Sequence, residues 1–401
     1  MTDSMKLKIY NSLTRKKELF QRSKNTVSIY VCGITPYDIT HLGHAFTYVF
    51  FDVVVRYLDF LGFQVTYVQN VTDVDDDIIR RAKEENINWR TLGEKHFKNF
   101  LNDLVFLNIR QPDFYPKATD HIKEIIEFNK ELLAKNFAYE KNGNLYFDIN
   151  KFKKYGRLSR LSKEGMLPVS RERGNDPDDP QKINPLDFVL WQKSKIDEPS
   201  WLSPWGNGRP GWHIECSTMS MKYLGSTLDI HGGGADLIYP HHESEIAQAE
   251  AVTGQVFARF FMHTAMLYYQ GKKMSKSLGN MVFINDLKNK FPANDLRLLF
   301  LGNHYRKEWE YSASLLDEAG QLSDLFKKVW QSQSGQGKDM IIEKFRTDFF
   351  SSLNDDFNTP KTLEILKNLA EEIINNKDEN TAPAKAFLNL AFNILGLRVE
   401  Y

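Results

Sequence analysis

The chain has 401 residues, 42% of them hydrophobic, and this length favours two or three domains over a single core. Lysine plus arginine equals aspartate plus glutamate at 52 each, which excludes a global positive field that would attract a polyanion. The only two cysteines, Cys32 and Cys216, indicate a reducing compartment without a disulfide framework. Residues 1–17 are polar and of mixed charge, unlike a signal peptide or membrane span, so we expect a soluble cytoplasmic protein.

Residues 1–116 predict the first half of a nucleotide-binding α/β fold. Strand-like runs at 27–31 and 64–70 alternate with helical runs at 47–60 and 76–85, as in a parallel sheet with crossover helices. The acidic run at 72–77 lacks the glycine and the distal glutamate of a calcium loop. We interpret it as a helix start, where acidic residues suit the helix dipole.

The remainder of the chain predicts an insertion, the second half of the sheet and a helical bundle. Residues 117–185 form the insertion, because a helical stretch is followed by a short strand and a polar segment with prolines. In 186–310 the α/β pattern resumes and completes a Rossmann-like domain, with strands expected at 186–191, 226–231 and 257–266. Residues 311–401 predict a bundle of helices at 315–330, 340–350, 363–374 and 384–397. Asn358 is a plausible cap of the third helix, with Pro360 in its first turn.

Two short segments are suited to binding a triphosphate. The first, Thr40-His41-Leu42-Gly43-His44, follows a buried strand and precedes a helix, where backbone N–H groups and the helix dipole favour an anion. Its two histidines can donate hydrogen bonds to phosphate oxygens, and Gly43 lets a nucleotide lie close to the backbone. The second, Lys273-Met274-Ser275-Lys276-Ser277, is polar and flanked by glycines, which indicates a mobile cationic loop. Either segment alone is weak evidence, because such runs are usually surface features.

Four residues that lie far apart in the sequence are competent zinc ligands: Cys32, Cys216, His241 and Glu245. His241 and Glu245 are four residues apart after Pro240, so they would share one face of a helix, and one ion could bridge both halves of the sheet. The alternative is that both cysteines are small buried hydrophobic residues and the histidines are polar surface.

The two phosphate segments together resemble the signature motifs of class I aminoacyl-tRNA synthetases. Three further runs are similar to the cysteinyl-tRNA synthetase family: Tyr30-Val31-Cys32-Gly33, Gly211-Trp212-His213-Ile214-Glu215-Cys216, and the run from His231 to Glu245. The resemblance implies a class I Rossmann-like catalytic domain that activates L-cysteine with ATP, giving cysteinyl-adenylate and pyrophosphate. It also implies that zinc is bound by Cys32, Cys216, His241 and Glu245 and recognises the substrate thiol, since zinc prefers thiolate to the hydroxyl of serine. Four protein ligands usually mark a structural site, which is the alternative.

The resemblance also implies roles for the residues of the site. His41 and His44 would meet the charge near the α-phosphate, while Lys273 and Lys276 would close over the leaving pyrophosphate with Mg²⁺. ATP would be bound by Thr40, Gly43, His44, Gly232, Gly233, Gly234, Asp236 and Lys276. The cysteine pocket would be lined by Gly33, Thr72 and Trp212. For Thr72 and Trp212 a strand-end hydroxyl and a core indole are the alternatives.

Two acceptors of the activated cysteine stay open, a small amine such as an amino sugar and the 3′ end of tRNA-Cys. In length and in wording such as Gly33-Ile34-Thr35-Pro36-Tyr37-Asp38, the chain resembles the paralogous mycothiol cysteine ligases, so the amine is slightly favoured. Basic residues of the insertion, at 151–154 with Arg157 and Arg160, could bind an acceptor stem or form a solvated face. A catalytically silent nucleotide-binding paralogue is a third interpretation, although no signature residue is missing. We expect a monomer.

Overall fold

The computed structural model describes residues 6–21, 25–37, 39–274 and 279–399. At its centre is a parallel sheet of four strands in the order β11-β10-β3-β4. The strands are β3 (Thr26–Ile34), β4 (Gln64–Val71), β10 (Leu228–Gly234) and β11 (Ala258–Thr264). The predicted α/β class with a parallel sheet is confirmed. Because the neighbours β3 and β10 come from different halves of the chain, the crevice at their carboxyl ends is the expected place for a ligand.

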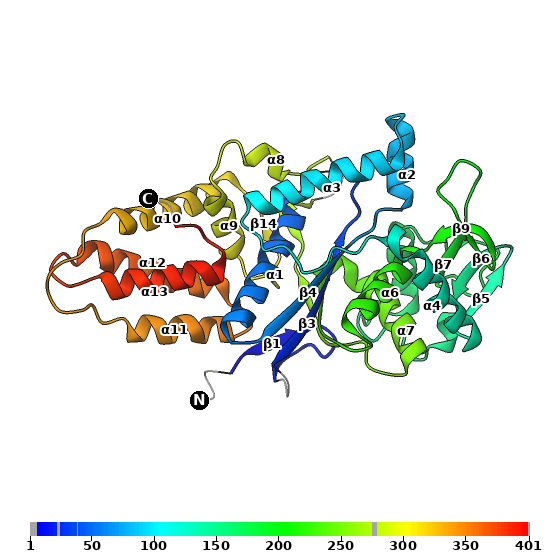
Figure 1. Cartoon of the computed structure of the whole chain (residues 1–401), viewed down its shortest axis with the longest axis horizontal. Helices are drawn as coiled ribbons and strands as arrows, with labels where there is room; N and C mark the ends of the chain where they lie inside the picture. The colour runs from blue at the N-terminus through cyan, green and yellow to red at the C-terminus, as the bar shows by residue number, and fades with distance from the viewer. Residues whose placement is uncertain (1–5, 22–24, 38, 275–278, 400–401) are drawn as a thin grey trace.

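Helices cover both faces of this sheet (Figure 1). α1 (Leu42–Phe60) packs against β4 and β10, while α6 (Trp212–Leu224) packs against β3 and β4 from the other side and contacts α7 (Glu243–Thr253). α1 is buried on nearly all sides because it lies between the sheet and the C-terminal helices, which explains its almost uninterrupted apolar sequence. Within the described residues, no helix combines the length and the apolar character needed to span a bilayer.

A second, antiparallel sheet in the order β5-β6-β7-β9-β8 combines strands of the predicted insertion with strands that follow it. The insertion contains α4 (Ile122–Ala134), β5 (Ala138–Lys141), β6 (Asn144–Phe147) and α5 (Lys163–Glu172), and it is followed by β7 (Phe188–Lys193), β8 (Trp201–Ser203) and β9 (Gly206–Pro210). The strand predicted at 186–191 exists as β7, but its assignment to the parallel sheet is wrong, because β7 pairs with β6 and β9. Its apolar side chains would be buried in either sheet, so the pattern alone did not identify its partners.

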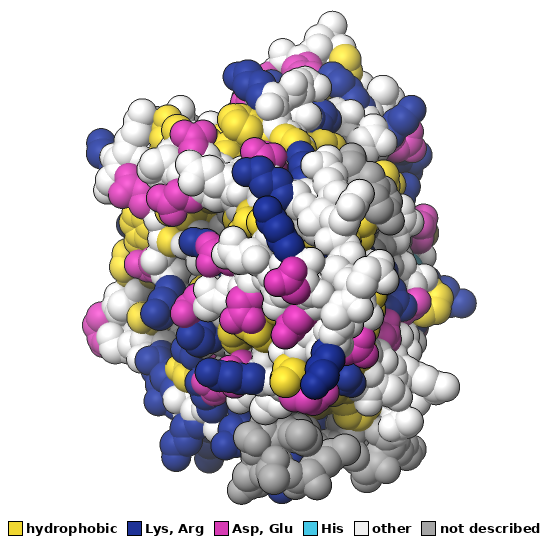
Figure 2. Space-filling model, turned by 90° about the vertical axis from the view of Figure 1, so that its left-hand side faces the viewer, with side chains coloured by type: hydrophobic (Ala, Val, Ile, Leu, Met, Phe, Trp, Pro, Cys, Tyr) yellow, Lys and Arg dark blue, Asp and Glu magenta, His cyan; other side chains and the backbone are white. Residues whose placement is uncertain are grey.

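Helices make up the C-terminal part of the chain as predicted. They are α9 (Ala293–Leu301), α10 (Ala313–Gln331), α11 (Glu343–Asn354), α12 (Thr359–Asn375) and α13 (Ala382–Leu395). The expected cap is confirmed, because Asn358 Oδ1 accepts a hydrogen bond from the N–H of Lys361 at 3.3 Å and Pro360 lies in the first turn of α12. Acidic and basic side chains are interspersed on this end of the molecule (Figure 2), in line with the equal charge totals.

The remaining elements connect these parts. They are β1 (Lys8–Asn11), β2 (Lys16–Leu19), α2 (Asp76–Glu84), α3 (Trp89–Phe106), β12 (Leu267–Tyr269), β13 (Lys272–Lys273), α8 (Ile284–Leu287) and β14 (Trp309–Glu310). The acidic run at 72–77 is the start of α2 as predicted, since Asp75 Oδ1 accepts from the N–H of Asp77 at 2.8 Å. The four-part division of the chain at 116, 185 and 310 stays a prediction.

Candidate active site and metal centre

A cavity of about 750 Å³ lies at the carboxyl ends of the parallel strands. Residues that follow β3, β10 and β11 line it, and the insertion contributes part of its wall. Of the residues predicted for the site, the cavity is lined by Cys32, Gly33, His41, Gly43, His44, Trp212, Gly234, Asp236 and Lys273. One pocket therefore brings together the first phosphate segment, part of the second and one candidate zinc ligand.

The first phosphate segment forms the amino terminus of α1. The helix begins at Leu42, five residues before the predicted start at 47. His41 is the N-cap, and its Nδ1 accepts from the N–H of His44 at 3.3 Å. The two imidazole rings stack with centroids 3.7 Å apart. Both rings therefore lie at the positive end of the helix dipole, on the cavity wall.

Backbone hydrogen bonds join the first phosphate segment to the residues that follow the second. The N–H of Leu42 donates to Val282 O, and the N–H of Ile284 donates to Thr40 O, both at 3.0 Å. Lys273, in β13, lines the cavity. Lys276 lies outside the described residues, so its predicted position stays a prediction. The two segments are thus held together although they are far apart in the sequence.

The four candidate zinc ligands converge from β3 (Cys32), α6 (Cys216), the turn before α7 (His241) and α7 itself (Glu245). One ligand atom from each lies within 4.8 Å of the other three, and all four residues are buried. Cys32 Sγ is 4.0 Å from both Cys216 Sγ and Glu245 Oε1, and His241 Nε2 is 3.9 Å from the same carboxylate oxygen. α7 begins at Glu243, so His241 lies in the preceding turn (Ile238–His242) rather than in the helix itself.

Burial fixes the electrostatics of this cluster. It raises the pKa of the Cys32 thiol well above its usual range, and the neighbouring Cys216 and Glu245 add to the rise. It also raises the pKa of the Glu245 carboxyl and lowers the pKa of His241 well below the usual value. Two thiols, a neutral imidazole and a carboxylate are a donor set that suits Zn²⁺, and a cation among them would favour the ionised thiol and carboxylate. The residues therefore fit the metal that the resemblance implies.

Further histidines that the sequence analysis missed lie against the cluster, and two of them, His231 and His242, form with Cys32 and Glu245 a second set of ligand atoms within 4.8 Å of one another. His231 Nε2 lies 2.8 Å from Glu245 Oε2, and His213 Nδ1 lies 2.9 Å from His241 Nδ1. His242 Nδ1 lies 2.9 Å from His263 Nε2. Such partners orient the groups that bind a metal. The available signal was that His231 and His263 lie in predicted strands, His242 lies beside His241, and His213 lies three residues before Cys216.

Three residues predicted to contact ATP or cysteine are closely packed within the protein, and their binding roles stay predictions. A Cβ at Gly232 would lie 2.2 Å from the Phe51 ring, and one at Gly233 would lie 2.8 Å from Leu237, so these glycines permit close packing inside the protein. Thr72 is buried, and its hydroxyl accepts from Asn70 Nδ2 at 3.2 Å. The buried, hydrogen-bonded hydroxyl of Thr72 is compatible with its alternative as a strand-end hydroxyl.

Asp236 and Trp212 lie where a substrate could reach them. The Asp236 carboxylate is 3.4 Å from Arg173 Nη1, which follows α5 of the insertion. The Trp212 ring stacks on the His241 ring with centroids 4.3 Å apart. Trp212 therefore connects the cavity wall to the ligand cluster.

Comparisons with known proteins address the identity of this site. The family model described as tRNA synthetases class I (C) catalytic domain matches residues 19–321. The chain belongs to the cysteinyl-tRNA synthetase family. The Cysteine--tRNA ligase of Histophilus somni is 45% identical over 98% of this chain and 85% of the relative. That of Legionella pneumophila is 47% identical over 97% and 85%, and that of Thermococcus onnurineus is 41% identical over 99% and 87%.

Solved structures agree on the fold. Mycobacterium tuberculosis methionyl-tRNA synthetase in complex with methionyl-adenylate has a TM-score of 0.63 at 14% identity, covering 92% of this chain and 88% of that one. A putative arginyl-tRNA synthetase from Campylobacter jejuni has a TM-score of 0.57 at 16% identity, covering 93% of each chain. The chain has the class I synthetase fold and is an AMP-forming ligase.

Proposed function

We propose that this protein activates L-cysteine with ATP and transfers it to the 3′ end of tRNA-Cys. The observation that carries the proposal is that Cys32 belongs to the buried ligand cluster and also lines the cavity that holds His41, His44 and Lys273. A thiol-binding centre and a phosphate-binding surface thereby share one pocket.

For the acceptor, the comparisons support tRNA rather than the small amine that the sequence analysis slightly favoured. That preference rested on chain length and motif wording, whereas relatives named Cysteine--tRNA ligase are 41–47% identical to nearly the whole chain. In the insertion, Lys151, Lys153 and Lys154 are exposed and could contact phosphates. Arg157 instead pairs with Glu250, and Arg160 donates to the Leu13 carbonyl, so these two arginines serve the fold.

In the first step, the cysteine carboxylate attacks the α-phosphate of ATP. His41 and His44 donate to the oxygens that gain charge, because both rings face the cavity at the amino terminus of α1. Lys273 and Lys276 offset the charge of the leaving pyrophosphate, and Mg²⁺ bound with ATP would supply further positive charge there. Gly234 and Asp236 also line the cavity, and we assign them to the nucleotide, because Gly234 offers bare backbone. Positioning and charge stabilisation account for catalysis, and no covalent enzyme intermediate is needed.

Selection of cysteine over serine is assigned to the ligand cluster. A bound Zn²⁺ would supply a soft Lewis acid with a strong preference for thiolate over hydroxyl. Shape alone would discriminate between such similar side chains by only about 1–3 kcal/mol. Cys32, Cys216, His241 and Glu245 would hold the ion, and Gly33 beside Cys32 also lines the cavity.

The acceptor is tested with labelled cysteine, ATP and total tRNA. We expect label in the tRNA fraction, and none when the tRNA has been oxidised with periodate, which destroys its terminal diol. A parallel reaction supplies glucosaminyl-inositol in place of tRNA and is examined for the amide by mass. Product with the amine and none with tRNA would contradict the proposal.

A further inference from the structure

Asp52 and Arg297 form a fully buried ion pair between α1 and α9. Asp52 Oδ2 lies 2.7 Å from Arg297 Nη2, and both side chains have 0% exposure. The same carboxylate accepts from Arg56 Nε at 2.9 Å and from the N–H of Arg110 at 2.8 Å. Asp52 therefore accepts from α9 and from the backbone of Arg110 as well as from Arg56 of its own helix. These contacts hold the middle of α1 to other segments of the chain.

Arg297 also holds the end of α13, the last helix of the bundle. Its Nε donates to Leu395 O at 3.2 Å, and its Nη1 donates to Leu107 O at 2.8 Å. Gly396 follows with a φ of +67°, and a Cβ there would lie 2.1 Å from Arg297 Nη2 and 2.8 Å from Asp52 Oδ2. The chain can turn at the end of α13 only because residue 396 has no side chain.

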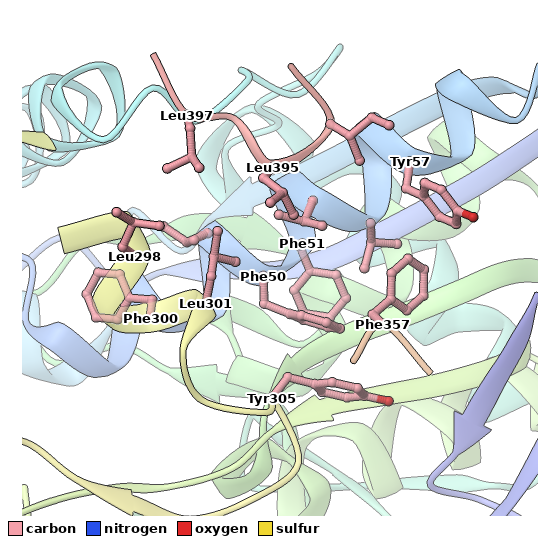
Figure 3. Close-up of a cluster of buried hydrophobic side chains, with 14 of the residues drawn as sticks. Phe50, Phe51, Tyr57, Leu298, Phe300, Leu301, Tyr305, Phe357, Leu395 and Leu397 are labelled. Carbon is pink, nitrogen blue, oxygen red and sulfur yellow. The ribbon is translucent and has the colours of Figure 1, made fainter. Parts of the chain in front are cut away.

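Apolar side chains of the same helices form one buried cluster. Figure 3 shows Phe50 and Phe51 of α1 in this cluster with Leu298 and Leu301 of α9 and Leu395 of α13. Buried ion pairs commonly add no net stability over hydrophobic replacements. What a charged pair adds here is directional hydrogen bonding, because Asp52 and Arg297 also bind the N–H of Arg110 and the carbonyls of Leu107 and Leu395.

The ion pair is connected to both phosphate segments. His44 precedes Asp52 by about two turns of the same helix, or about 12 Å along its axis. α9 follows the second phosphate segment, whose next residues bond to the first through Leu42 with Val282 and through Ile284 with Thr40. A shift of α1 relative to α9 would therefore move His41 and His44 relative to the second segment.

We propose that Asp52 and Arg297 are positioning residues that fix α1, α9 and the end of α13 in one arrangement and thereby set the rate of adenylate formation. The inference rests on the proposed function. Asp52 and Arg297 do not contact substrate in this proposal. The placement of the C-terminal bundle then determines the geometry at the ATP site.

The test replaces the pair by apolar residues of similar size in the double variant Asp52→Leu/Arg297→Met. We measure the melting temperature, zinc content, and kcat and KM of cysteine-dependent pyrophosphate exchange. The expected result is a melting temperature lowered by several degrees, because the N–H of Arg110 and the carbonyls of Leu107 and Leu395 lose their partners. We also expect unchanged zinc, KM values within about threefold, and a kcat lowered at least about tenfold. A folded variant with wild-type kcat, or one with a raised KM and unchanged kcat, would overturn the inference.

Two further variants keep the test decisive. Arg297→Lys retains the charge next to Asp52, but a lysine cannot reach both Leu107 O and Leu395 O. This variant should therefore also lower kcat with little change in KM. If the double variant does not fold, Arg297→Lys is judged by the same criteria. The control is Arg306→Met, which removes another arginine from a buried aspartate, Asp356, at the base of the bundle. We expect it to lower the melting temperature while kcat stays within about twofold. Exchange by the wild-type protein in the same assay reports separately on the proposed function.

Discussion

Replacing Gly33 with alanine tests whether the close contact between β3 and β4 is needed to hold the zinc site. Gly33 lies where the register between β3 and β4 shifts, and its N–H donates to Asn70 Oδ1 at 2.8 Å. A Cβ at residue 33 would lie 1.7 Å from Asn70 O and 2.7 Å from the carbonyl carbon. Ordinary contact begins at about 3.4 Å, so the backbone of β4 would have to retreat by about 1.7 Å.

The expected cost follows from this collision. Overpacking commonly costs about 1–3 kcal/mol, and a clash between backbone atoms in a hydrogen-bonded ladder should reach the upper end, about 3 kcal/mol. Thermal unfolding followed by circular dichroism should show a melting temperature several degrees lower. Metal analysis should show a lower zinc content, because the displacement that separates β3 from β4 also shifts Cys32, which lies in β3. The control is Gly93→Ala in α3, where the Cβ would meet only Pro36 Cγ at 3.9 Å and alanine favours the helix. A Gly33→Ala protein with the melting temperature and zinc content of wild type would refute the reasoning.

Three further predictions concern the ligand cluster, the phosphate-binding surface and the dependence of stability on pH. Cys216→Ser should lose both zinc and cysteine-dependent pyrophosphate exchange, and retention of both would remove this residue from the site. Lys273→Ala should lower the exchange kcat at least about tenfold with little change in melting temperature, because a half-buried lysine of a short strand has little packing to lose; a large drop in melting temperature would contradict this role. Burial lowers the pKa of His304 to about 4, so the unfolded chain binds a proton there between pH 6.5 and 4 that the folded protein does not. The free energy of unfolding of wild type, relative to that of His304→Asn, should therefore fall as the pH falls through this window, by at most about 1.4 kcal/mol per pH unit. Denaturant titrations measure this difference. A difference that is constant with pH would show that His304 is not the group responsible.

Local patterns identified most elements because helices and strands depend on residues that are near in the sequence. The β-branched run of β3 and the capped start of α12 are examples. The pattern did not show that β7 pairs with β6, since strand pairing depends on residues far apart. It also placed the start of α1 too late, because His41 caps the helix with a ring nitrogen instead of the usual short polar side chain.

The candidate site was predictable to a similar degree. The spacing of His241 and Glu245 indicated a shared face, but only the resemblance joined them to Cys32 and Cys216, which the fold brings within 4.8 Å. His213 and His231 contact those residues through ring nitrogens, and no spacing rule predicts contacts between a strand, a helix and a turn. The Asp52–Arg297 pair was likewise invisible, because each residue stands between apolar neighbours in its own helix and its partner lies on another helix.

The central claim is that the cluster of Cys32, Cys216, His241 and Glu245 holds a metal that binds the thiol of the substrate. It is tested most directly with protein in which Co²⁺ replaces the native metal, because Co²⁺ absorbs light through charge transfer from each bound thiolate. We predict that the thiolate absorption increases when L-cysteine is added and stays constant when L-serine is added. An absorption that does not change with saturating L-cysteine would contradict the account and leave the metal a structural role.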